Sequence, residues 1–159
     1  MKSINSYITE KLKISKGSKY TLFPKTKEDL IDMIHNEIGK NGNECSLNHI
    51  DVSKIEKLND LFSTLYKLSD FNGDISNWDV SNAKSIGGMF EKSKFNGDLS
   101  KWEVSNIENM SWLFSNSEFN NDSICDWDVS NVNNMTYMFY KSKFNYDISN
   151  WDVSKVTNM

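Results

Sequence analysis

Residues 71–82 read FNGDISNWDVSN, and this stretch returns three more times along the chain. Successive copies start 24, 24 and 25 residues apart, and their tryptophans keep nearly the same period. A degenerate earlier unit, IDVSKIEKLNDLF (50–62), has isoleucine where the others have tryptophan, so the repetition begins near residue 50. The later copies are FNGDLSKWEVSN (95–106), FNNDSICDWDVSN (119–131) and FNYDISNWDVSK (144–155).

This period predicts the fold class. Repeats of about 20 to 29 residues are typical of leucine-rich-repeat solenoids, in which each coil buries its apolar side only by stacking on its neighbours. Ile75, Trp78 and Val80 follow the L-x-x-L-x-L spacing, which predicts a short strand with the tryptophan inward. Ser130 then stands where a helix N-cap belongs, and apolar residues follow at helical spacing. We therefore expect an α/β repeat, a leucine-rich-repeat-like solenoid with short strands and short helices.

The turn between coils has its own pattern. Its second position is always asparagine, and we expect these side-chain amides to stack and bond to the backbone of neighbouring turns. The next position holds Gly73 and Gly97, a residue type that tolerates a positive φ. The asparagines are Asn72, Asn96, Asn120 and Asn145.

The extended motif FNGDISNWDVSNVxxMxxMF resembles the repeat of the BspA-like leucine-rich-repeat proteins, which is also found in mycoplasma lipoproteins. The resemblance covers about residues 50–159. It implies a right-handed solenoid, and the known members of the family are surface proteins that bind host or partner proteins. It supplies no catalytic residues. The four copies predict about four coils.

The two ends of the chain differ from the repeats. Residues 1–49 carry 8 lysines and 6 acids, whereas residues 50–159 carry 10 lysines and 16 acids. Thr26, followed by Asp29, predicts a capped helix that Gly39 or Gly42 ends, so residues 1–49 are expected to form an N-terminal helical cap. The last unit is incomplete at Met159, and we expect either a longer protein or a homodimer through the open C-terminal end.

The amino-acid composition argues against some classes of binding partner. The formal net charge is −4 and all 18 basic residues are lysine, which argues against a nucleic-acid partner. No apolar run has the length of a signal peptide or a membrane span. A first helix is predicted around Ile4, Ile8 and Leu12, and we expect it to dock on the cap rather than on a membrane. The expected location is the cytoplasm of a bacterial cell or a phage-infected host, with the cell surface as the alternative.

The inventory of reactive groups is small. Two histidines come with no nucleophile elbow and no dinucleotide fingerprint, so we do not expect an enzyme. The best candidates for chemistry are His35, Cys45 and His49. Cys45 and His49 would supply two metal ligands where structural zinc needs four, and Cys45 and Cys125 are too far apart in sequence to suggest a disulfide framework. No metal and no cofactor is expected.

Candidate binding residues lie beside the tryptophans. An acid follows each of them, and stacked coils would bring these acids together as a strip that favours a basic partner. The alternative is that each acid caps the following turn locally. The residue before each tryptophan varies in type, as expected of positions that set specificity. The acids are Asp79, Glu103, Asp128 and Asp152, and the variable residues are Asn77, Lys101, Asp126 and Asn150.

A second candidate surface contains Trp112 and Tyr137, at the position that Asp60 and Gly88 fill in other units. Aromatic side chains are common hot spots of interfaces, although a tryptophan at such a position is more often packed on a neighbouring coil. We therefore expect a non-enzymatic protein-protein interaction module that binds another, basic, protein through the solenoid face. The alternatives are a phage-type inhibitor of a host or defence enzyme, and a bacterial surface adhesin.

Overall fold

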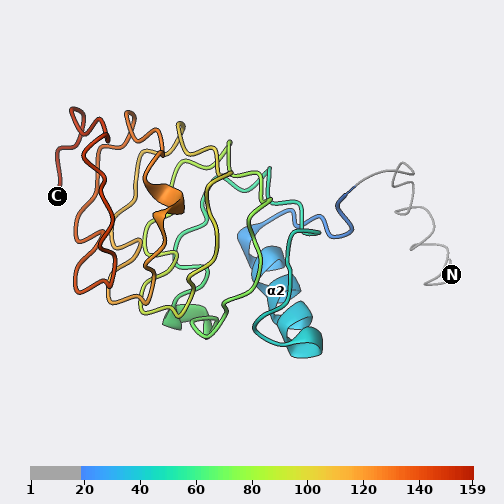
Figure 1. Cartoon of the computed structure of the whole chain (residues 1–159). Helices are drawn as coiled ribbons and strands as arrows, with labels where there is room; N and C mark the ends of the chain where they lie inside the picture. The colour runs from blue at the N-terminus through green and yellow to red at the C-terminus, as the bar shows by residue number, and fades with distance from the viewer. Residues whose placement is uncertain (1–18) are drawn as a thin grey trace, which may run out of the picture.

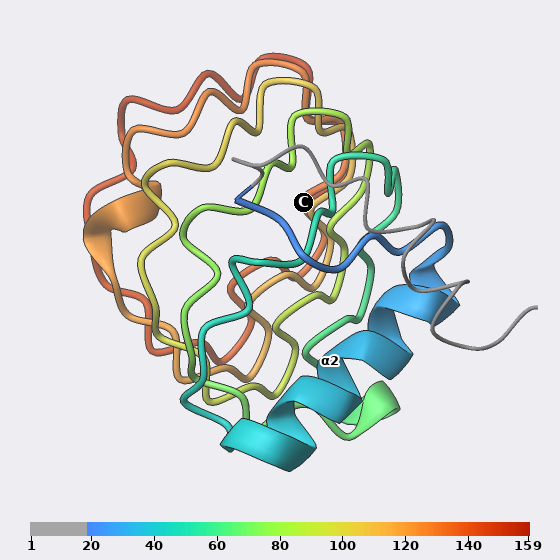
Figure 2. The same cartoon turned by 90° about the vertical axis from the view of Figure 1, so that its right-hand side faces the viewer.

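The computed structural model describes residues 19–159, so the helix expected around Ile4, Ile8 and Leu12 lies outside the described residues. Successive repeats lie side by side as irregular coils, and helix α2 (Lys27–Asn41) lies at the end of the stack farthest from the C-terminus (Figure 1). Viewed along the stack, the coils overlie one another (Figure 2). Two 3₁₀ turns, η1 (Thr64–Tyr66) and η2 (Asp122–Ile124), interrupt the coils.

The expected fold class, an α/β leucine-rich-repeat solenoid of short strands and short helices with a helical cap, is wrong. Between residues 19 and 159 α2 is the only α-helix, and no sheet forms. Strand pairing is reduced to isolated parallel bridges, and the coils consist mainly of turns. Four of these bridges form one line across the stack: Lys57–Ser85, Ser85–Asn109, Asn109–Asn134 and Asn134–Asn158.

The expected short helices are absent because their backbone bonds run to the next coil. The N–H groups of Met110, Trp112 and Phe114 donate to carbonyls 24 residues further along the chain, at 2.8–2.9 Å. A group that bonds to a neighbouring coil cannot also form the bond to the fourth preceding residue that defines an α-helix. Trp112 and Asn116 have φ of 60° and 53°, which also interrupts a right-handed helix.

The expected short strands are replaced by turns for a related reason. The backbone N–H of Trp78 donates to the carbonyl of Ile75 in the same coil, at 3.1 Å. The indole Nε1 of Trp78 donates to the carbonyl of Leu47 in the preceding coil, at 3.0 Å, and Trp102, Trp127 and Trp151 bond in the same way. The indole N–H groups thus bond to backbone carbonyls that would accept from a neighbouring strand in a β-sheet. The inward direction predicted for the four tryptophans is confirmed, with exposures of 2 to 9%.

Two phenylalanine columns complete the core. Rings of neighbouring coils stack nearly parallel, 5.6–5.8 Å apart in one column and 6.2–6.4 Å apart in the other. Buried aromatic rings contribute large apolar areas, so these columns hold the coils together. The first column is Phe62, Phe90, Phe114 and Phe139, and the second is Phe71, Phe95, Phe119 and Phe144.

The asparagine ladder predicted for the turns is confirmed. The side-chain oxygen of Asn72 accepts from the backbone N–H of Asn96 at 2.8 Å, and the same bond continues through Asn120 to Asn145. Gly73 and Gly97 do not have the positive φ that their type suggested. A Cβ at Gly73 would lie 2.0 Å from the carbonyl oxygen of Cys45, so close packing between coils is the reason for glycine there.

The ends of the stack are unlike each other. Helix α2 begins with the predicted capping box of Thr26 and Asp29, ends at Gly42, and buries Leu30 and Ile34. At the other end an apolar pocket of about 550 Å³ is lined by Met135, Met138, Phe139, Ile148, Trp151 and Met159, among others. The homodimer expected through this end stays a prediction.

Candidate functional site

The four acids beside the tryptophans, Asp79, Glu103, Asp128 and Asp152, are exposed on successive coils and are called the acidic column. Each of the three aspartates accepts a hydrogen bond from the backbone N–H of the serine two residues on, at 3.0–3.1 Å. For Asp79 the hydroxyl of Ser81 donates as well, at 2.6 Å. The local capping that was left open is therefore present at the aspartates.

Capping also favours the ionised form of three of these acids. Hydrogen bonds from the serines, the hydroxyl first and the backbone N–H second, lower the pKa of Asp79, Asp128 and Asp152 from the ordinary value. Their carboxylates stay ionised at neutral pH and are held in one orientation, while the remaining surface faces solvent. Capping and the formation of an acidic surface are therefore compatible.

The variable positions before the tryptophans, Asn77, Lys101, Asp126 and Asn150, are also exposed. Lys101 donates to the side-chain oxygen of Asn77 in the preceding coil, at 3.2 Å. Together with Asp79 and Glu103 these two residues line a hollow of about 280 Å³. The structure thus brings the acidic column and the variable positions together on one part of the surface.

The second candidate surface is built on a column of residues with left-handed backbone. Asp60, Gly88, Trp112 and Tyr137 have φ between 53° and 64°, and they are called the left-handed column. This conformation strains bulky side chains. Trp112 is 38% exposed and Tyr137 52%, their ring centroids lie 4.6 Å apart, and Tyr140 adds a third exposed ring 5.4 Å from Tyr137. Trp112 is therefore partly packed on the next coil and partly open to a partner.

A hollow of about 400 Å³ lies next to Trp112 and was not predicted from the sequence. Its lining includes Gly87 and Gly88 together with Asp60, Glu91 and Trp112. We call it the Gly87 hollow. Desolvation by burial raises the pKa of Asp60 from its ordinary value. Gly87 and Gly88 are the one pair of adjacent glycines in the sequence, but the sequence alone does not place Asp60 and Trp112 beside them.

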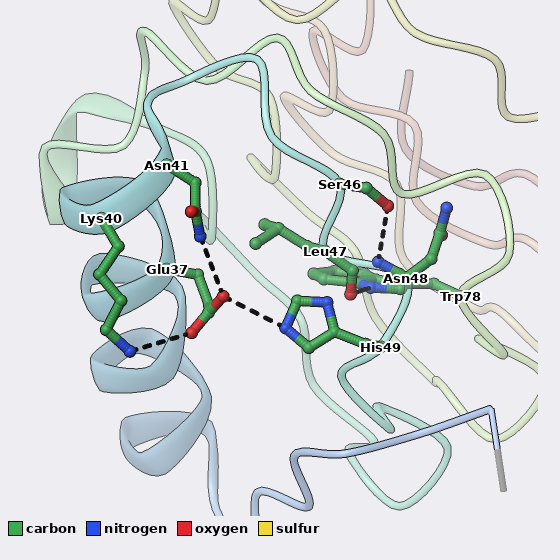
Figure 3. Close-up of polar contacts among 8 residues, drawn as sticks. All are labelled: Glu37, Lys40, Asn41, Ser46, Leu47, Asn48, His49 and Trp78. Carbon is green, nitrogen blue, oxygen red and sulfur yellow. Dashed lines mark hydrogen bonds and ion pairs between the residues drawn. The ribbon is translucent and has the colours of Figure 1, made fainter.

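Two of the three candidates for chemistry, Cys45 and His49, lie where α2 meets the first coil. Figure 3 shows Glu37 of α2 between His49, whose Nε2 is 3.3 Å from its carboxylate, and Lys40 at 3.4 Å. Asn41 also donates to Glu37, at 3.3 Å. The contact with His49 joins the helix to the first coil, whereas Lys40 and Asn41 hold Glu37 from within α2. His35 is exposed on α2 and makes no such contact within residues 19–159.

Cys45 lies near this junction, half-buried, and its thiol pKa is raised, mainly by burial and then by the charge of Glu37. A raised pKa leaves less of the nucleophilic thiolate at neutral pH. No group of three metal-binding side chains occurs in the part of the chain that the structure describes. Across the same residues no helix has the length and apolar character needed to cross a membrane.

Comparison with known proteins gives one result. The family model described as "Mycoplasma protein of unknown function, DUF285" matches residues 29–142 and again residues 93–159. No curated protein and no solved structure matches the chain. The two matches together span most of the repeats and α2, so the chain belongs to this family, Mycoplasma protein of unknown function, DUF285.

Proposed function

We propose that this protein is a non-enzymatic binding module whose acidic column contacts a basic protein. The observation that carries the proposal is the regular exposure of one carboxylate per coil, three of them oriented by hydrogen bonds from serine. Orientation before binding reduces the conformational entropy that a partner would otherwise have to overcome. A row of like charges also accelerates the encounter with an oppositely charged partner.

The surroundings of the column support the same function. The adjacent residues Asn77, Lys101, Asp126 and Asn150 are exposed and differ from coil to coil, so they offer a means of discriminating between partners. The repeat motif resembles that of the BspA-like proteins, whose known members bind other proteins, and this resemblance favours a binding role over a catalytic one.

The test uses poly-L-lysine as a basic probe, with affinity measured at physiological ionic strength. The column variant carries Asp79→Asn, Glu103→Gln, Asp128→Asn and Asp152→Asn. Asparagine keeps the side-chain oxygen that accepts from serine, so the charge is removed while the turn is retained. The matched control removes four exposed charges elsewhere: Asp32→Asn, Glu44→Gln, Glu56→Gln and Glu108→Gln.

We expect the column variant to lose about ten-fold in affinity and the control about two-fold, because only the column presents its charges along one line. Equal losses in both variants would show that overall charge attracts the probe, and the proposal would then be wrong.

A further inference from the structure

The Gly87 hollow is open because Gly87 and Gly88 have no side chains to fill it. Gly88 has φ +64°, and a Cβ built there would lie 2.3 Å from the carboxylate oxygen Oδ1 of Asp60. Asp60 therefore leans over Gly88, toward the next coil. At Gly87 a Cβ would lie 3.0 Å from the amide nitrogen of Asn59 and 3.2 Å from the carbonyl oxygen of Ser111. Any larger residue at either position would begin to fill the hollow.

The polar groups of the hollow leave one carboxylate without a hydrogen bond. No donor among residues 19–159 hydrogen-bonds to the carboxylate of Asp60. The charge of Lys27 opposes the rise in the pKa of Asp60, but its Nζ forms no ion pair with that carboxylate. The Nζ donates to the backbone carbonyl of Asn59 and lies over the ring of Tyr66, 4.9 Å from its centroid. Glu91 is already paired with Lys92 at 3.1 Å. Asp60 is thus the acid of the hollow whose carboxylate oxygens have neither a hydrogen bond nor an ion pair among residues 19–159.

The aromatic wall adds a second, independent feature. Trp112 lines the hollow, and the centroid of its ring lies 4.6 Å from that of Tyr137, which does not line the hollow. Four other tryptophans donate their Nε1–H to backbone carbonyls, but that of Trp112 has no acceptor among the residues described. A free carboxylate beside an exposed indole is the combination that attracts an organic cation.

We propose that the Gly87 hollow receives the guanidinium group of an arginine side chain on an exposed loop of the partner protein. The guanidinium is flat, so it can stack on Trp112 while its N–H groups donate to Asp60. An anion would be repelled by Asp60 and Glu91, and a neutral donor would leave the negative charge of Asp60 uncompensated. A second copy of this chain cannot supply the ligand, because the sequence contains no arginine.

This inference rests on the proposed protein-binding function and adds the chemistry of one contact. The probe is the peptide acetyl-Gly-Arg-Gly-amide, compared with the same peptide carrying citrulline, which keeps the shape of arginine without its charge. The readout is the indole N–H signal of Trp112 in the NMR spectrum of the ¹⁵N-labelled protein. The four buried indoles provide signals that report whether the fold is intact.

We expect the arginine peptide to shift the Trp112 signal with a dissociation constant on the order of 1–10 mM, as befits a single cation contact. The citrulline peptide should bind at least about five-fold more weakly, because the charge is absent. Asp60→Asn should weaken the arginine peptide by a similar factor. Gly87→Ala should weaken it by filling the hollow, whereas Gly39→Ala, where a Cβ meets nothing within 4 Å, should have no effect.

The column variant separates the two proposals. It should keep the arginine peptide within about two-fold of wild type, because the acidic column does not line this hollow. A normal Trp112 shift together with unimpaired poly-L-lysine binding by the column variant would reject the acidic column and retain the hollow. No shift of Trp112, or equal shifts with arginine and citrulline, would reject the hollow and leave the column proposal standing.

Discussion

The phenylalanine columns and the left-handed column make opposite use of the same repeat. In the core, Phe62, Phe90 and Phe114 are identical, fully buried and stacked. On the left-handed column each coil has a different residue, although the backbone has the same conformation in all of them. A position that the fold dictates keeps its residue from coil to coil. A position whose backbone geometry repeats while its residue changes is free to serve recognition. Comparing equivalent positions of successive coils therefore separates structural residues from residues available for binding.

The largest effect should come from breaking a phenylalanine column. Phe114→Ala removes a ring that is fully buried and lies 4.1 Å from Phe119 between centroids. We expect the free energy of unfolding, measured by urea denaturation, to fall by about 3–5 kcal/mol. Tyr140→Ala, an aromatic truncation at a site 44% exposed, is the control and should cost less than about 1 kcal/mol. Similar losses at both sites would contradict the distinction between core and surface.

At the left-handed column, glycine should be favoured over larger residues, the reverse of its usual effect on the free energy of unfolding. Gly88→Ala should lower the free energy of unfolding by about 1–3 kcal/mol, because alanine is strained at this φ and its Cβ would meet Asp60. Trp112→Gly should change it by less than about 1 kcal/mol, because glycine relieves the strain that tryptophan bears there.

A double-mutant cycle with Asp60→Ala checks the cause of the Gly88 effect, again by urea denaturation. Removal of the Asp60 carboxylate should abolish the clash, so that Gly88→Ala costs only the backbone strain, about 1 kcal/mol. If the penalty is unchanged in the Asp60→Ala background, the close contact between these coils is not its source.

A smaller loss should follow from breaking the asparagine ladder. Asn96→Ala removes the side-chain oxygen that accepts from the backbone N–H of Asn120 at 2.8 Å. We expect a loss of about 1 kcal/mol, the usual net worth of one hydrogen bond, in thermal or urea denaturation. Asn133→Ala is the matched control, since the side chain of Asn133 makes no hydrogen bond among residues 19–159 and its replacement should be nearly neutral. Equal losses would argue that the ladder contributes nothing particular.

Much of the interior could be predicted from the sequence, because it depends on residues that recur. The inward tryptophans and the asparagine ladder follow from period alone, and Thr26 with Asp29 is enough to place the start of α2. The secondary structure of the coils could not be predicted in this way. The spacing of Val132, Met135 and Met138 fits a helix, and all three are buried. Yet the N–H of Met135 bonds to the next coil, and those of Val132 and Met138 bond to the third preceding residue, so no α-helix forms.

Of the candidate surfaces, too, one part could be predicted from the sequence and another could not. The exposure of the acidic column follows from alternation around Trp78, and its capping by Ser81 was one of two alternatives that the residues allowed. The Gly87 hollow could not be predicted, because it depends on three consecutive coils placing Asp60, a glycine pair and Trp112 in register. Asp60, Gly88 and Trp112 share a left-handed backbone conformation. Among residue types only glycine suggests that conformation, so Asp60 and Trp112 gave no sign of it in the sequence.

The smallest effect concerns protonation, and it should have opposite signs at the two surfaces. The pKa of Asp79 is lowered by its serine, so its stabilising contribution is complete above the unfolded-state pKa and is lost as the pH falls through the folded-state pKa. The pKa of Asp60 is raised by burial, so its ionisation weakens the fold as the pH rises through the folded-state value.

At neutral pH, Asp79→Asn should therefore lower the free energy of unfolding and Asp60→Asn should raise it. Solvent screening at these partly exposed sites limits each change to about 0.5 kcal/mol. NMR titration of the two carboxyl groups provides the direct measurement, with Asp60 expected to titrate at the higher pH. The opposite order would mean that the charge of Lys27 outweighs the burial of Asp60 in the free protein, and the hollow would then have no uncompensated charge with which to bind arginine.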